Sequence, residues 1–97
     1  MTLNDDSFDF ARYQLMWELC VDLRRELMSD LVSSDRIEGI LRRMALLIDG
    51  DAISRMDRIV AISKSENLKS VWKHLKAKKE FHLELKEYKE NEKEKLE

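Results

Sequence analysis

Apolar residues recur at three- and four-residue steps through residues 8–31, and this spacing predicts a long first helix. Ser7 stands just before this segment as an N-cap, and Asp9 falls in the first turn, where a negative charge is favourable. The stripe expected to face the core comprises Tyr13, Met16, Trp17, Cys20, Leu23, Leu27 and Leu31.

This first helix is apolar around most of its circumference. Its consistently polar strip is narrow and consists of Gln14, Glu18, Asp22, Arg25 and Ser29. A helix with so wide an apolar surface is buried on several sides, and three partner helices in so short a chain need not cover it. We therefore predict a homodimer, and the candidate self-association residues, which lie off the main stripe, are Leu15, Leu19, Met28 and Val32.

Two shorter helices follow, over residues 36–49 and 52–64. Asp35, with Glu38 three residues later, resembles a capping box and predicts the start of the helix over residues 36–49. Gly50 is suited to the left-handed conformation that ends a helix, and Asp51 is an N-cap for the next one. The expected buried stripes are Ile37, Ile40, Leu41, Met44, Leu47 and Ile48, then Ile53, Met56, Ile59 and Val60.

The apolar stripe changes direction within the last helical segment, which begins after a cap at Ser65 or Asn67. Leu68, Val71, Trp72 and Leu75 cluster on one side, whereas Phe81, Leu85 and Tyr88 cluster on another. The two directions differ by roughly 120°, and supercoiling accounts for only about 20° per heptad. Either the helix bends within residues 76–80, or one continuous helix presents a second face to another molecule.

Composition makes the fold class all-α. The chain of 97 residues has no proline and two glycines, so it lacks the frequent turn residues of sheet proteins. We expect a small bundle of four helices, the last long, charged and projecting at its C-terminal end. Residues 1–6 form a frayed N-terminus, 7–88 the bundle domain, and 89–97 a charged, solvated tail.

Charged residues change type along the chain. All arginines lie at or before Arg58 and all lysines at or after Lys64, while every acid after Asp57 is a glutamate. Residues 1–63 have eight arginines against twelve acids, and residues 64–97 have ten lysines against eight acids. The net charge of -2 favours no class of partner, but the last third is a separate, basic and strongly helix-forming region.

No catalytic, metal or cofactor motif is present in the sequence, so we predict that the protein is not an enzyme and uses no cofactor. His74 and His82 are eight residues apart, not the four of a helical metal pair. Cys20 lies among apolar residues and is expected in the core. The chain has neither a secretion signal nor an apolar run long enough to span a bilayer, so we expect a cytoplasmic protein with no membrane partner.

The predicted function is a protein–protein interaction module: a small cytosolic regulator, inhibitor or adaptor that binds another protein through a helical surface. An aromatic or leucine every three to four residues on a charged helix is typical of a helix that binds in a groove. The same apolar residues could instead pack along the first helix, and both interpretations stay open. The candidate partner-binding residues are Trp72, Phe81, Leu85 and Tyr88, with Lys73, Lys76 and Lys79.

The alternative function is a dimeric nucleic-acid-binding regulator. A row of lysines can track phosphates, but the absence of arginine there disfavours base-specific contacts. The second and third helices also resemble a helix-turn-helix only weakly, because the would-be recognition helix begins Asp51-Ala52-Ile53. The candidate nucleic-acid contacts are Lys64, Lys69, Lys73, Lys76, Lys78 and Lys79.

Overall fold

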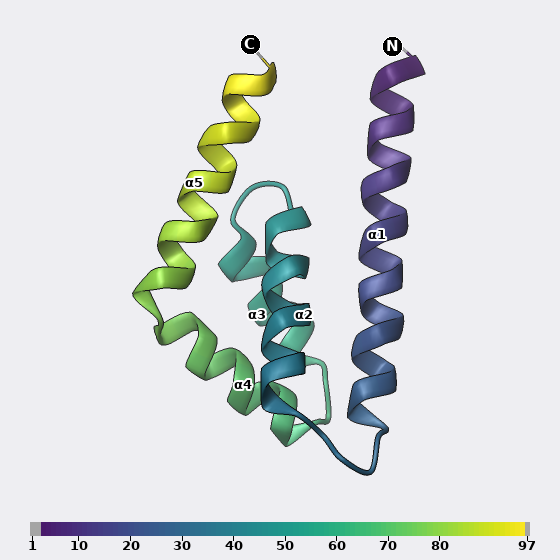
Figure 1. Cartoon of the computed structure of the whole chain (residues 1–97), viewed down its shortest axis with the longest axis vertical. Helices are drawn as coiled ribbons and strands as arrows, with labels where there is room; N and C mark the ends of the chain where they lie inside the picture. Colours follow the sequence, from purple (N-terminus) through teal and green to yellow (C-terminus); the bar gives the residue numbers. More distant parts are fainter. Residues whose placement is uncertain (1–2, 97) are drawn as a thin grey trace.

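The computed structural model describes the backbone of residues 3–96 and the side chains of residues 10–91. Its helices are α1 (Leu3–Leu27), α2 (Ser34–Leu47), α3 (Ala52–Ala61), α4 (Glu66–Ala77) and α5 (Lys79–Leu96) (Figure 1). No strand occurs within residues 3–96, so the all-α prediction is confirmed.

Five helices are present within the described range, and the prediction of four is wrong. The expected last helix is divided at Lys78, whose backbone is extended (φ -80°, ψ 121°). Of the two interpretations of the changing stripe, the bend within residues 76–80 is therefore the one that the chain adopts. It lets α5 turn back beside α2, and only its last turns extend past the α2–α3 connection (Figure 1).

Short polar side chains fix the starts of the inner helices. Ser33, Asp51 and Ser65 each accept a hydrogen bond from a backbone N–H near the start of α2, α3 and α4, respectively. Such caps satisfy donors that have no partner inside the helix. The Asp51 and Ser65 caps and the left-handed Gly50 (φ 81°) are as predicted, whereas α2 is capped by Ser33 and not by Asp35.

The first helix differs from its predicted bounds at both ends. It begins at Leu3, before the expected Ser7 cap, and ends at Leu27, four residues before the expected end. The chain turns after Leu27, and the backbone N–H of Ser33 donates to Glu26 Oε1 at 3.0 Å. This hydrogen bond ties the connection back to the end of α1.

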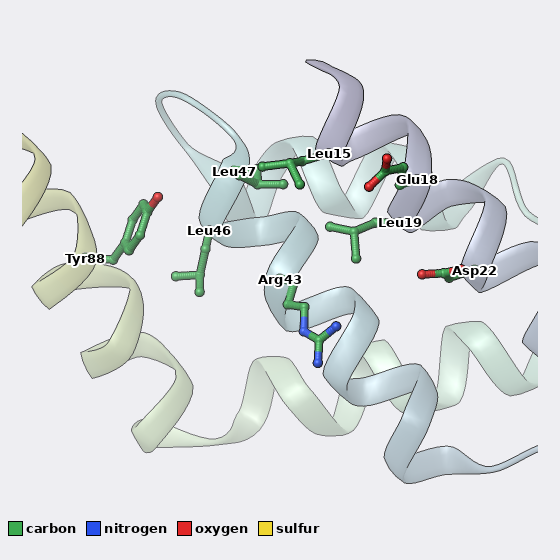
Figure 2. A pocket seen from close by; sticks show the side chains of 8 residues that line it. All are labelled: Leu15, Glu18, Leu19, Asp22, Arg43, Leu46, Leu47 and Tyr88. Atoms are coloured by element: carbon green, nitrogen blue, oxygen red, sulfur yellow. The ribbon is translucent and has the colours of Figure 1, made fainter. Parts of the chain in front are cut away.

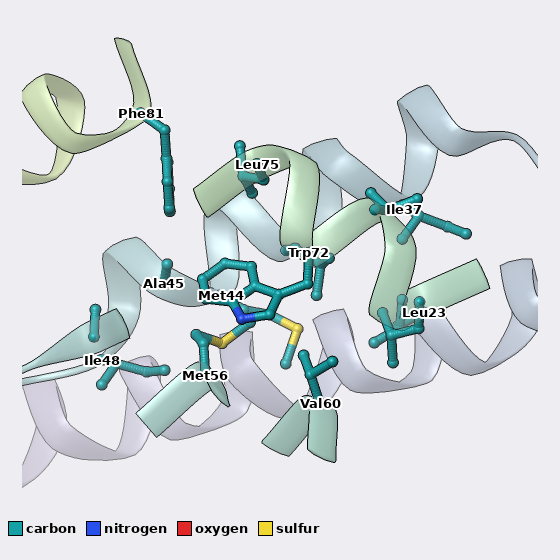
Figure 3. Packing of buried hydrophobic residues seen from close by; sticks show 14 of the residues in the cluster. Leu23, Ile37, Met44, Ala45, Ile48, Met56, Val60, Trp72, Leu75 and Phe81 are labelled. Atoms are coloured by element: carbon teal, nitrogen blue, oxygen red, sulfur yellow. The ribbon is translucent and has the colours of Figure 1, made fainter. Parts of the chain in front are cut away.

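Helix α2 forms the centre of the molecule and contacts each of the other four helices. Its inward residues Ile37, Leu41, Met44 and Ala45 are no more than 1% exposed. Figure 3 shows how side chains from neighbouring helices converge on this face. The predicted stripes of the second, third and early fourth helices supply most of this core.

Helix α5 joins the core through Phe81, which is fully buried. The Phe81 ring meets the Trp72 ring edge to face, with centroids 5.9 Å apart and planes at 81°. The Arg42 guanidinium lies over the Phe81 ring, 5.9 Å from its centroid. Leu85, one turn further along, is also buried. The apolar residues that point in the second direction are therefore buried inside the chain, against α2 and α4 and not along α1.

Phe81 and Leu83 form a matched pair for measuring this contribution, because both belong to α5 but only Phe81 is buried. Removing a buried phenylalanine side chain costs about 3–5 kcal/mol, whereas an exposed substitution changes stability by about 0.5 kcal/mol or less. We expect Phe81→Ala to lower the free energy of unfolding by that larger amount. Leu83, which is 58% exposed, provides the control Leu83→Ala.

Urea unfolding followed by circular dichroism measures both variants. Since the total stability of a small domain is about 5–15 kcal/mol, Phe81→Leu provides a milder variant if the alanine variant does not fold. Equal losses for Phe81→Ala and Leu83→Ala would show that α5 does not pack as described.

Candidate functional site

The residues predicted to form a partner-binding ridge do not form an exposed surface. Trp72, Phe81 and Leu85 are buried in the core, and Tyr88 is half-buried beside a pocket. Trp72, Phe81 and Leu85 are therefore core residues and not an exposed partner-binding surface. The physical reason is the extended Lys78, which redirects α5 so that its apolar side meets α2.

Polar contacts hold Trp72 in place as well. Its indole N–H donates to Asp57 Oδ1 at 2.8 Å, and Lys76 Nζ lies 2.8 Å from the same oxygen. The hydrogen bond from Lys76, with a smaller contribution from that of Trp72, holds the pKa of Asp57 below its usual value. This cluster joins α3 to α4, so Trp72 and Lys76 are structural contacts rather than parts of a free binding face.

The predicted lysine row is interrupted in the same way. Lys78 Nζ donates to Glu38 Oε1 at 2.7 Å, and Lys76 is paired with Asp57. The row's other members, Lys64, Lys69, Lys73 and Lys79, are exposed. A surface that binds a phosphate backbone needs several uncompensated cations together, and the two acids reduce that charge.

Arg42 of α2, one of the two helices compared with a helix-turn-helix, also has its contacts within the chain. Arg42 donates to Glu84 at 2.8 Å and to Glu38 at 3.0 Å while its guanidinium lies over Phe81. This side chain therefore joins α2 to α5.

Most of the large apolar side chains that are exposed within residues 10–91 lie on α1 or directly after it. Phe10, Tyr13, Trp17 and Met28 are between 62% and 74% exposed, and Cys20 between them is exposed too. We call this set of five residues the outer face. By the roughly 100° turn per residue, its aromatic side chains point roughly 130° away from Leu19 and Leu23, which pack on α2.

The structure thus agrees only in part with the predicted core side of α1: Met16, Leu23 and Leu27 face the core as expected, but other residues of the stripe do not. Tyr13, Trp17 and Cys20 were expected in the core but are exposed, and Leu19 was expected outside but is buried. The predictions for Cys20 and for Leu19 as a self-association residue are wrong. The other three candidates, Leu15, Met28 and Val32, are exposed.

Two charged residues lie on the core side of α1 and make this side look polar in the sequence. The side chains of Arg12 and Glu26 are only 16% and 12% exposed, and they lie at the two ends of the stripe through Leu19 and Leu23. Arg12 pairs with Asp49, while Glu26 pairs with Arg36 and accepts from the Ser33 N–H. Long polar side chains can cover an apolar seam with their stems while their heads find partners. Counting Arg12 and Glu26 as helix-packing positions would have identified this stripe.

A pocket of about 370 Å³ lies between α1, α2 and α5 (Figure 2). Its lining combines apolar side chains with three charged ones. The lining residues are Leu15, Glu18, Leu19, Asp22, Arg43, Leu46, Leu47 and Tyr88. Neither histidine nor the cysteine lines it, so the pocket presents apolar area and charge rather than a nucleophile with a base.

Three further findings bear on the class of protein. Among residues 10–91, no three His, Cys, Asp or Glu side chains are gathered as metal ligands. No described helix combines the length and apolar character needed to cross a membrane. Comparisons with models of protein families, with curated proteins and with solved structures find no match.

The pairing of Glu38 predicts a pH dependence of stability. The hydrogen bond from Lys78, helped by Arg42, holds the pKa of Glu38 below its usual value against the opposing effect of burial. A carboxylate whose pKa is lowered by folding stabilises the protein above its unfolded pKa, and this contribution disappears as the pH falls through the folded value. Glu38→Gln should therefore cost about 1 kcal/mol at pH 7, the upper range for partly exposed pairs.

Urea unfolding between pH 7 and about pH 2.5 measures this effect, since the usual glutamate pKa is about 4.3. The difference in unfolding free energy between the natural chain and Glu38→Gln should shrink as the pH falls below the usual pKa. Exposed Glu90 provides the control variant Glu90→Gln. A difference that stays constant with pH would contradict a role for the ionised Glu38.

Proposed function

We propose that this protein is a non-enzymatic interaction module, a small cytosolic regulator or adaptor that binds a protein through the outer face of α1. The single observation that carries the proposal is the exposure of Phe10, Tyr13 and Trp17 on one side of a helix whose opposite side is packed. This is the class of function that the sequence predicts, but the proposed binding surface lies on the first helix instead of the last helical segment.

The size of this surface supports the proposal. An aromatic side chain has roughly 150–250 Å² of surface, so three of them at this exposure leave several hundred Å² open to water. Exposed apolar patches of roughly 300–600 Å² on a monomer are often functional. Burial of this surface against a partner is worth about 25 cal/mol per Å² before the costs of association.

The packing that holds α1 against α2 also supports the proposal. Leu19 and Leu23 pack α1 against α2, and the Arg12–Asp49 pair adds a polar contact between α1 and the α2–α3 connection. A helix held on one side presents the side chains of its other side in a fixed arrangement, so little conformational entropy is lost on binding. Tryptophan and tyrosine are enriched among the residues that dominate binding energy.

We do not extend the proposal to nucleic acid. The Lys76–Asp57 and Lys78–Glu38 pairs divide the lysine row, and the outer face of α1 has aromatic residues without a row of cations beside them.

The test uses Tyr13→Ser/Trp17→Ser with the control Ile62→Ser/Leu83→Ser, which removes two other exposed apolar side chains. Loss of two central aromatic contacts should weaken binding by about 2 kcal/mol or more, which is over tenfold. Tagged protein is recovered from cells of its source, and bound proteins are quantified by mass spectrometry. Circular dichroism checks that both variants remain helical.

We expect proteins bound by the natural chain to be retained by the control and lost by the α1 variant. Equal recovery with both variants would show that the outer face of α1 is not the binding surface.

A further inference from the structure

We propose that the outer face of α1 pairs with the same face of a second copy in an antiparallel arrangement, with Tyr13 of each copy opposite Trp17 of the other. This inference rests on the proposed function because it uses the same surface. It adds that the molecule bound there is a second copy of the chain, and that the two α1 helices run antiparallel.

The spacing along α1 supports pairing with another helix. Exposed residues at positions 10, 13, 17, 20 and 24 follow alternating steps of three and four residues. This is the repeat by which two helices pack along a shared seam. The core-facing residues Arg12, Met16, Leu19, Leu23 and Glu26 follow the same repeat on the other side of the helix. Helix α1 therefore has two seams of one kind, and only one of them is covered by α2.

Charge along this seam selects the orientation. In a parallel pair each residue lies opposite its own counterpart, so Arg24 would meet Arg24 of the second copy, and like charges repel. In an antiparallel pair centred between Tyr13 and Trp17, the two copies of Arg24 lie at opposite ends of the helix pair and do not meet. The helix dipoles then also run in opposite directions, which is the favourable arrangement.

The same register brings apolar residues together at the centre. Phe10 lies opposite Cys20, and Tyr13 lies opposite Trp17, on each side of the two-fold axis. A surface of this kind is self-complementary, as a two-fold dimer requires. The rest of the molecule lies beyond the inner side of α1, so the two bundles would sit on opposite outer sides of the helix pair (Figure 1).

The available area fits a reversible dimer. The three aromatic residues are 62–74% exposed, and each has roughly 150–250 Å² of surface, so together they offer roughly 300–550 Å² per copy. Two copies would thus bury roughly 600–1,100 Å² from these residues alone, near the lower limit of about 1,000–1,200 Å² for specific interfaces. We therefore expect a dimer that dissociates on dilution.

Cysteine cross-linking tests both the occupant and the orientation, because Cys20 lies on the seam and is exposed. The variant Phe10→Cys retains Cys20, so an antiparallel pair places position 10 beside Cys20 of the second copy. The matched control Phe10→Cys/Cys20→Ser has only the cysteine at position 10. Each protein is oxidised at high concentration, and mass spectrometry identifies the linked peptides.

We expect Phe10→Cys to form at least about tenfold more covalent dimer than the control or the natural chain, since cysteines whose Cα atoms are more than about 7 Å apart cannot bridge. The linked peptides should join position 10 to Cys20. Efficient Cys20–Cys20 linkage in the natural chain would instead indicate a parallel pair and overturn the proposed orientation.

Light scattering of the natural chain over a range of concentrations separates this inference from the proposed function. A monomer at all concentrations, without cross-links in Phe10→Cys, would overturn the pairing of two copies. Recovery of another protein that depends on Tyr13 and Trp17 would still support the outer face as a binding surface. A dimer that is unaffected by Tyr13→Ser/Trp17→Ser would contradict pairing through the outer face and would leave the proposed function to the recovery experiment.

Discussion

The fold depends on the burial of α2, a helix of 14 residues that contacts all four other helices. Its inward side chains exclude water almost completely, and Trp72 and Phe81 extend the same cluster into α4 and α5. Burial of this kind is the dominant favourable term in folding. The other helices are therefore positioned by where they meet α2, and their remaining sides are left for solvent or for another molecule.

Helix α1 shows the consequence most clearly. It packs on α2 through Leu19 and Leu23, with Arg12 and Glu26 at the ends of the packed stripe. Nothing else in the described chain covers its outer face, so three aromatic side chains remain exposed. In contrast, α5 brings Phe81 back to α2, so its charged outer side needs no partner. The asymmetry between these two flanking helices is the basis for placing the interaction surface on α1.

The predictable part of the fold follows from local signals in the sequence. Asp51, Ser65 and Gly50 have fixed geometric roles, and the stripe of α2 is continuous, so these elements were found. The break at Lys78 was indicated only by the change in stripe direction, which left a bend and a continuous helix both open. Its extended backbone suits any residue, and no glycine or proline marks it. The core side of α1 was predicted only in part, because Arg12 and Glu26 are charged yet mostly buried. That choice depends on partners distant in sequence, such as Asp49.

Hydrogen exchange at two protein concentrations tests most directly the claim that α1 has one side held by α2 and one side held by another copy. Binding stabilises the bound form by RT ln(1 + [L]/Kd), so pairing slows exchange as concentration rises. We predict slower exchange of α1 backbone amides between residues 10 and 24 at high concentration, with a smaller change in α2. Identical exchange of α1 at both concentrations, over a range that spans the expected dissociation, would contradict the account.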